Sequence, residues 1–185
     1  MNNKSLLQKI ENLPVPILPT MVGAFTLSNV YLNMGYTWIR HITAWATILI
    51  LIAYITKIVV YPKTCMKEYS NTVPASLYAG FTMITMILGS YFYNASPVFG
   101  KTLWFAGLIL HAIHILIFTY RNVLKGVNMQ TFVPSWFVTY NGIMVSTVVG
   151  GVMNEPLIGK IVVYYGIAIF TIIIPFMIYR LAKYE

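Results

Sequence analysis

The sequence predicts an all-α integral membrane protein with six transmembrane helices, arranged as three helical hairpins that repeat in parallel. Two compositional observations predict the membrane class: 58% of the 185 residues are hydrophobic and only 9% are charged. A soluble domain carries about a quarter charged residues. The third observation is a series of apolar runs, several of them close to the ~20 residues that a helix needs to cross a bilayer.

The apolar runs define six segments, and each is expected to be helical because backbone inside a bilayer must satisfy its own hydrogen bonds. In chain order they cover residues 19–34, 39–60, 75–92, 103–120, 133–153 and 158–179. Residues 1–13 are predicted to form a cytoplasmic amphipathic lead-in, and residues 14–185 a transmembrane domain. Its three hairpins cover about residues 14–61, 74–120 and 133–179.

Basic residues in the connections predict the orientation of the hairpins. Nine lie on one side of the predicted membrane: Lys4, Lys9, Lys57, Lys63, Lys67, Arg121, Lys125, Arg180 and Lys183. The opposite side has only Arg40, Lys101 and Lys160. Lys and Arg are retained on the cytoplasmic side, so we expect a multi-pass protein of the cytoplasmic membrane with both termini inside the cell.

An internal period supports the division into hairpins. Prolines mark the start of each leading segment, and Pro16, Pro74 and Pro134 are 58 and 60 residues apart. The trailing segments end on Tyr61, Tyr120 and Tyr179, at intervals of 59 residues. Because a period of this length equals one hairpin, the three units are expected to point the same way across the membrane.

The two segments of each hairpin differ in composition. Gly, Ser, Thr and Asn make up 20 of the 55 residues in the leading segments, against 8 of the 62 in the trailing segments. Small and polar residues are typical of helix interfaces and of surfaces that face water, whereas Ile, Leu and Phe face lipid. We therefore predict that the odd-numbered helices are inner and the even-numbered helices outer.

The small and polar residues also fall at helical spacing, which predicts the lining of a passage. The predicted lining residues are Gly23, Thr26, Asn29, Asn33, Thr82, Thr85, Gly89, Ser135, Thr139, Gly142, Ser146 and Gly150. The alternative is close helix packing, with Ser and Thr bonded to carbonyls of their own helix. Prolines in the first turn would fix the start of each inner helix without losing a helix hydrogen bond. These prolines are Pro16, Pro19, Pro74 and Pro134.

The distribution of carboxylates indicates which ions could pass. The sequence has no Asp, and its four Glu residues all lie in connections or at the terminus. Carriers coupled to protons or cations place carboxylates within the membrane, so a cation pathway has no evident ligand. Hydroxyls, backbone N–H groups and helix N-termini bind anions. The sequence therefore predicts a small anionic substrate.

Specific stretches resemble a known transporter family. The leading segments contain PILPTMVGAF, VPASLYAGF and VPSWFVTYNG, and the trailing segments end in VVYPK, FTYRN and MIYRLAKY. They resemble the tellurite-resistance/dicarboxylate transporter family, which includes TehA and the plant slow anion channels. The resemblance implies a pore of five helical hairpins, odd helices inside, assembled as a trimer that moves dicarboxylate, tellurite or small inorganic anions.

The resemblance covers only the first three of the five hairpins. We therefore expect either a truncated product or a wall that another chain completes. The phenylalanine that gates the family's pore lies on the ninth helix, so no residue here is assigned that role. The implied partners are the anion, the lipid bilayer and further copies of the chain.

Two other functions remain as alternatives. His111 and His114 lie three residues apart in one segment and could serve a b-type cytochrome or another membrane redox subunit. The chain could also be an inactive membrane fragment. No nucleophile with a partnered base and no phosphate loop is present, so no catalytic residue, metal ligand or cofactor is predicted. The basic residues are dispersed among the connections, which argues against nucleic acid as a partner.

Overall fold

The computed structural model describes residues 6–184, and every regular element in that range is helical. The first five residues of the predicted lead-in, including Lys4, and the terminal Glu185 lie outside the described residues. The helices are α1 (Leu6–Glu11), α2 (Ile17–Asn33), α3 (Thr37–Val60), α4 (Pro62–Ser70), α5 (Thr72–Leu77), α6 (Ala79–Tyr93), α7 (Pro97–Thr119), α8 (Ser135–Asn141), α9 (Val145–Val148) and α10 (Pro156–Lys183).

Four helical stretches are long and apolar enough to cross a membrane, which makes this a membrane protein of the predicted all-α class. They are Thr37–Val60, Thr72–Tyr93, Pro97–Leu124 and Pro156–Lys183. The predicted first span does not reach that length, because the 17 residues of α2 extend only about 26 Å against a hydrocarbon core of ~30 Å. The predicted fifth span is not one helix at all. Six continuous spans are therefore not what the structure shows.

The fifth segment was expected to be a continuous helix, and that expectation is wrong. α8 ends at Asn141 and is followed by a 3₁₀ turn at Gly142–Met144, the single turn of α9, and another 3₁₀ turn at Gly150–Met153. Glycine is about 1 kcal/mol less favourable than alanine inside a helix, and β-branched residues also lower helix propensity. Residues 142–152, GIMVSTVVGGV, combine both types, which explains why regular helix fails from Gly142 onward.

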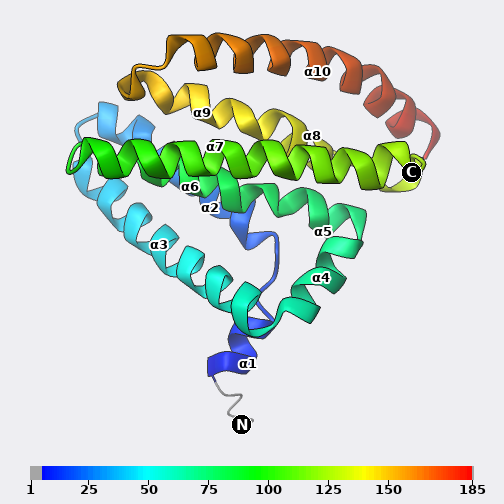
Figure 1. Ribbon diagram of the computed structural model, residues 1–185, viewed down its shortest axis with the longest axis horizontal. Coiled ribbons are helices and arrows are strands. Elements are labelled where there is room, and N and C mark those ends of the chain that lie inside the picture. Colours follow the sequence, from blue (N-terminus) through cyan, green and yellow to red (C-terminus); the bar gives the residue numbers. More distant parts are fainter. Residues whose placement is uncertain (1–5, 185) are drawn as a thin grey trace.

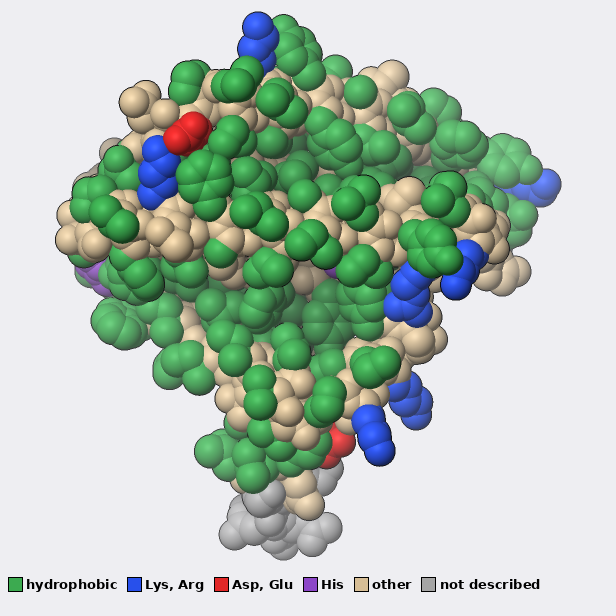
Figure 2. All heavy atoms as spheres, in the orientation of Figure 1, with side chains coloured by type: hydrophobic (Ala, Val, Ile, Leu, Met, Phe, Trp, Pro, Cys, Tyr) green, Lys and Arg blue, Asp and Glu red, His purple; other side chains and the backbone are tan. Residues whose placement is uncertain are grey.

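The central element is α6. Within the stretch Thr72–Tyr93, 72% of the most apolar window is buried, against 22–28% in the other three candidate spans. Figure 1 shows why: α7 crosses in front of α6, α10 and α9 lie above them, and α3 lies below. The exposed surface of α3, α7 and α10 is dominated by apolar side chains (Figure 2).

Short turns precede α3, α7 and α10, whereas residues 120–134 form a longer connection from α7 to α8. The turns between α2 and α3, between α6 and α7, and before α10 all lie at the left of Figure 1. The first contains Gly35 with φ +92°, and the last contains Asn154 with φ +55°. Both are left-handed conformations, which Gly and Asn adopt most readily. A residue with positive φ therefore lies in the turn before each of α3 and α10.

Candidate functional site

The leading helices approach one another closely at glycines. A Cβ atom added to Gly80 of α6 would lie 2.8 Å from the backbone nitrogen of Pro19 and 2.9 Å from the carbonyl carbon of Leu18 in α2. No side chain fits at such a distance, so only glycine lets α2 pack directly on α6. This crossing brings the leading helices of the first two hairpins together.

The α6–α7 contact is built in the same way. A Cβ on Gly89 would lie 2.6 Å from the Trp104 backbone nitrogen, and a Cβ on Gly100 would lie 2.6 Å from the Gly89 carbonyl oxygen. Gly107 faces Thr82 and Met86 of α6 at similarly short distances. Gly89, predicted to line a passage, is therefore buried in the interface between a leading and a trailing helix.

A buried polar network joins α6, α7 and α8 through His111. Its Nε2 lies 2.9 Å from the Thr139 carbonyl oxygen, and its Nδ1 lies 2.6 Å from the Thr82 hydroxyl. A carbonyl can only accept, so Nε2 carries the proton and the neutral ring accepts at Nδ1. His111 is fully buried and Thr82 is 6% exposed. Both ring nitrogens are thus engaged in ties between helices.

His114 is engaged in the same way one turn further along α7. The Thr139 hydroxyl donates to the Ser76 carbonyl at 3.2 Å and lies 3.5 Å from His114 Nε2. The Tyr69 hydroxyl lies 2.8 Å from His114 Nδ1. Burial raises the pKa of Tyr69 above its usual value, against the opposing charge of Arg121, so its phenol stays protonated and can donate.

These bonds bear on the redox alternative. Among residues 6–184, no group of three or more His, Cys, Asp or Glu side chains could hold a metal ion. The ring nitrogens of His111 and His114 are directed at hydroxyl and carbonyl groups of neighbouring helices. Their positions account for the two histidines as packing residues, and the structure gives the cytochrome interpretation no support.

The predicted lining residues of the third hairpin lie largely in helix interfaces. A Cβ on Gly142 would meet the His111 ring at 2.7 Å and the Met83 sulfur at 2.8 Å. The Ser146 carbonyl accepts from the Trp104 indole at 3.0 Å, and Gly150 packs on the same indole. The Ser146 hydroxyl is buried without a hydrogen-bond partner and borders a cavity of about 280 Å³. It is the one lining candidate here with a free donor in the described structure.

Two hydroxyls connect the second and third hairpins at the proline-led ends of their leading helices. The Ser76 hydroxyl lies 2.6 Å from that of Ser135. Ser76 lies two residues after Pro74, and Ser135 directly follows Pro134. Pro74 is the third residue of α5, and Pro134 is the N-cap of α8. Thr85, the remaining candidate on α6, is 6% exposed and donates to the Phe81 carbonyl of its own helix.

The predicted lining residues of the first hairpin are more exposed than those of the other two hairpins. Gly23, Thr26 and Asn33 of α2 are exposed, and Asn29 is half-buried. A Cβ on Gly23 would meet nothing within 4 Å. These four residues define the α2 polar stripe. The structure therefore separates the predicted lining into an open part on α2 and a largely buried part on α6, α8 and α9.

The entrance prolines of α2 lie where the helix begins. Pro16 is the N-cap and Pro19 is the third helical residue. The segment just before them is tied to α3, because Tyr54 donates to the Pro14 carbonyl at 2.7 Å and Lys57 donates to the Leu13 carbonyl at 2.8 Å. Proline rigidity and these two bonds together set the start of α2.

Lys57 does not lie in a connection, as its sequence position had suggested. It was counted among basic residues of a connection, but it lies in the last turn of α3, is fully buried and pairs with Glu68 of α4 at 2.7 Å. Other basic residues counted on the same side are exposed: Lys9, Lys63, Lys67, Lys125 and Lys183. Nothing in the local sequence distinguishes Lys57 from a surface lysine, because its partner comes from another helix.

Comparison with known proteins agrees with this architecture. A family model described as voltage-dependent anion channel matches residues 18–185, from α2 through α10. A comparison with curated proteins finds no match. The resemblance to the tellurite-resistance/dicarboxylate transporter and slow anion channel family is confirmed, and membership implies anion channel or transport activity in a membrane. The chain belongs to the voltage-dependent anion channel family.

Proposed function

We propose that the chain forms a channel-like passage for small anions, with α2, α6 and the α8–α9 segment on the aqueous side. The observation that carries this proposal is the α2 polar stripe. Asn and Thr side chains exposed on a membrane helix are costly against lipid, because their amides and hydroxyls find no hydrogen-bond partner there. A stripe of this kind must face water or another protein surface.

The trailing helices provide the contrast. On α3, Ile42, Leu49 and Ile52 are 54–66% exposed, and on α10 Ile167 and Ile178 are 58% and 62% exposed. Such side chains are stable against acyl chains and unfavourable against water. The polar stripe supports that face of α2 as water-facing, and the exposed apolar side chains support α3 and α10 as lipid-facing elements, within six membrane-crossing segments in three hairpins.

The electrostatics favour anions over cations. The carboxylates of Glu68 and Glu155 are neutralised by Lys57 and Lys101 at 2.7 and 2.6 Å. Exposed lysines on α4 and after α7 then leave one end of the molecule positive, which concentrates anions there. Hydroxyl and amide groups such as the free Ser146 donor could replace part of an anion's hydration shell.

The finer features follow from family membership and are part of the proposal. The substrate would be a dicarboxylate, tellurite or a small inorganic anion, carried without a cofactor. The protein would lie in the cytoplasmic membrane with both termini inside, and copies of the chain would assemble as a trimer. Residues of the α2 polar stripe are the lining groups that the described geometry leaves exposed, and the buried Ser146 hydroxyl is the one that borders a cavity.

Two exposed positions provide a matched test. A Cβ added to Gly23 on α2 would meet no atom within 4 Å, and Ile167 on α10 is 58% exposed. In liposomes that contain the purified chain, Gly23→Trp should reduce chloride, malate or tellurite flux about tenfold by narrowing the passage. Ile167→Trp should leave the flux within about twofold of the original, because it lies on the proposed lipid-facing surface of α10.

The outcomes separate the competing interpretations. Equal loss of flux in both variants would show that the α2 face has no special role, and an unchanged flux in Gly23→Trp would contradict the proposed passage. Absence of flux in the unsubstituted chain would favour the inactive fragment. Potassium flux measured in parallel should stay at the level of empty liposomes.

A further inference from the structure

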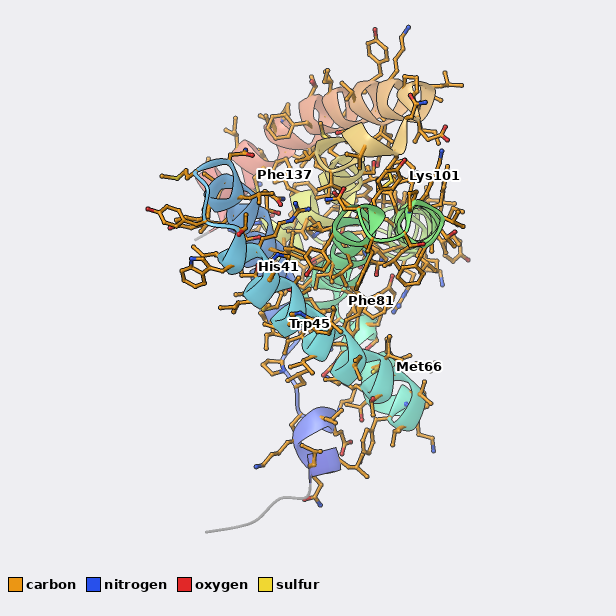
Figure 3. All side chains as sticks on the ribbon, turned by 90° about the vertical axis from the view of Figure 1, so that its left-hand side faces the viewer. His41, Trp45, Met66, Phe81, Lys101 and Phe137 are labelled. Carbon is orange, nitrogen blue, oxygen red and sulfur yellow. The ribbon has the colours of Figure 1, made fainter. Side chains whose placement is uncertain are left out.

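A crevice of about 430 Å³ opens at the end of the molecule where the α2–α3 and α6–α7 turns lie. Its polar lining comes from Thr37, Arg40 and His41 at the start of α3 and from Asn94 in the α6–α7 turn. Figure 3 views the molecule from this end and shows His41 on α3. The crevice lies between the start of α3 and the end of α6, and Leu32 of α2 also lines it.

Arg40 lies in this crevice without a counterion. No hydrogen bond or ion pair of its guanidinium is present in the described part of the chain, and its Nε is buried with no partner. The guanidinium carbon lies over the face of Tyr91 in a cation–π contact, 5.7 Å from the ring centroid. A cation partly withdrawn from water and left unpaired is unfavourable, so this site is incomplete without an anion.

No carboxylate of the described chain can supply that charge. Glu11 accepts a hydrogen bond from Thr64, Glu68 pairs with Lys57, and Glu155 pairs with Lys101. None of the three lines the crevice. A counterion for Arg40 would therefore come from outside the described residues.

The surrounding groups select the type of anion. A guanidinium presents N–H donors in a planar fork that matches the oxygens of a phosphate group. The Tyr91 hydroxyl lies 2.8 Å from His41 Nδ1, which fixes the imidazole at the rim. The crevice also lies at the N-terminus of α3, where free backbone N–H groups and the helix dipole favour an anion. Donors therefore surround the position next to Arg40.

The other wall is apolar and continues toward the membrane. Leu32, Trp45 and Phe92 line the crevice beside the polar groups. Trp45 is 61% exposed and continues into the exposed face of α3, where Ile42 is 60% and Leu49 66% exposed. Figure 3 shows Trp45 next to His41 along α3. A ligand with a charged head and an apolar tail would contact both walls.

We propose that this crevice binds the phosphate headgroup of an anionic membrane phospholipid. The phosphate pairs with Arg40 and accepts from Thr37 or Asn94, and the acyl chain lies on Trp45 and the exposed face of α3. A headgroup with net negative charge is preferred, because the site holds a cation and no carboxylate. Inorganic phosphate shares the headgroup chemistry but makes no contact with the apolar wall.

Lipid retention by the purified full chain tests this proposal. Native mass spectrometry would measure binding of phosphatidylglycerol, phosphatidylcholine and diacylglycerol, and of inorganic phosphate alone. Phosphatidylglycerol should bind most tightly, and Arg40→Gln should weaken it about tenfold, the loss of one charge-assisted bidentate contact. Lys160→Gln is the matched control, because Lys160 also lies over a tyrosine, 6.0 Å from the ring of Tyr164, and should bind within about twofold of the original.

A second variant protects the test against misfolding. Asn94 is an exposed turn residue, so Asn94→Ala should fold and still weaken phosphatidylglycerol binding about threefold. Equal binding by Arg40→Gln and the original chain would overturn the proposal. So would equal binding of diacylglycerol, which lacks the phosphate, or inorganic phosphate binding as tight as that of the lipid. Anion flux does not enter these measurements, so the result is independent of the proposed passage.

Discussion

The ammonium group of Lys57 lies 2.7 Å from Oε1 of Glu68 and 2.8 Å from the Leu13 carbonyl oxygen. The other carboxylate oxygen of Glu68 accepts from the Tyr78 hydroxyl at 2.6 Å. One ion pair thereby joins α3, α4, the start of α6 and the residues before α2. Because a buried lysine would otherwise be strongly unfavourable, this pair fixes the relative positions of these four segments.

Removal of the Lys57 charge should therefore destabilise the protein. Glu68 remains 26% exposed, so Lys57→Met should lower the free energy of unfolding by about 1–3 kcal/mol, below the value for a fully buried pair. The double variant Lys57→Met with Glu68→Gln should recover part of that loss. Thermal or denaturant unfolding in neutral detergent would measure both.

The Lys101–Glu155 pair is the control for this prediction. Its nitrogen–oxygen distance is 2.6 Å, but its side chains are 36% and 31% exposed. Lys101→Met should cost no more than about 1 kcal/mol, as for exposed pairs. Equal destabilisation by Lys57→Met and Lys101→Met would contradict the structural role assigned to Lys57.

Glycine contacts between helices give a second prediction. A Cβ on Gly100 would lie 2.5 Å from the Tyr93 Cα and 2.6 Å from the Gly89 carbonyl oxygen, and both are backbone atoms. Gly100→Ala must therefore push α6 and α7 apart, at a cost of about 1–3 kcal/mol. Gly159→Ala meets no atom within 4 Å and should raise stability by up to about 1 kcal/mol through helix propensity.

Unfolding of the two alanine variants checks this prediction under identical conditions. A destabilised Gly100→Ala beside an unchanged or stabilised Gly159→Ala is the expected pattern. If Gly100→Ala were as stable as the original chain, the α6–α7 contact could not be as close as the structure shows.

The positions of the helices were largely predictable, because long apolar runs and flanking prolines mark them in the sequence. α3, α7 and α10 follow such runs closely. The fifth segment was not predictable by the same reasoning, because hydropathy does not show whether an apolar run forms a regular helix. Glycines and β-branched residues interrupt the helix from Gly142 onward. The first segment, predicted over residues 19–34, corresponds closely to α2 at Ile17–Asn33, and the chain turns at Gly35 immediately after it.

The contacts of polar residues were less predictable, because they depend on which helices meet. Thr82 and Thr139 fit a passage and a helix interface equally well in sequence, and only the position of His111 decides between them. Arg40 shows the converse. In the sequence it was only one of the few basic residues on its side of the predicted membrane. The lack of any carboxylate near its guanidinium could be seen only once α3 and the α6–α7 turn were placed together.

The most direct test of the account is chemical labelling of the α2 polar stripe in a membrane. Cys65 is the single cysteine of the chain and is buried, so a Cys65→Ser background leaves no competing thiol. In that background, Thr26→Cys on α2 and Ile167→Cys on α10 would be treated with a membrane-impermeant thiosulfonate reagent in liposomes. The account predicts rapid modification at residue 26 and protection at residue 167. Modification at residue 167 with protection at residue 26 would contradict it.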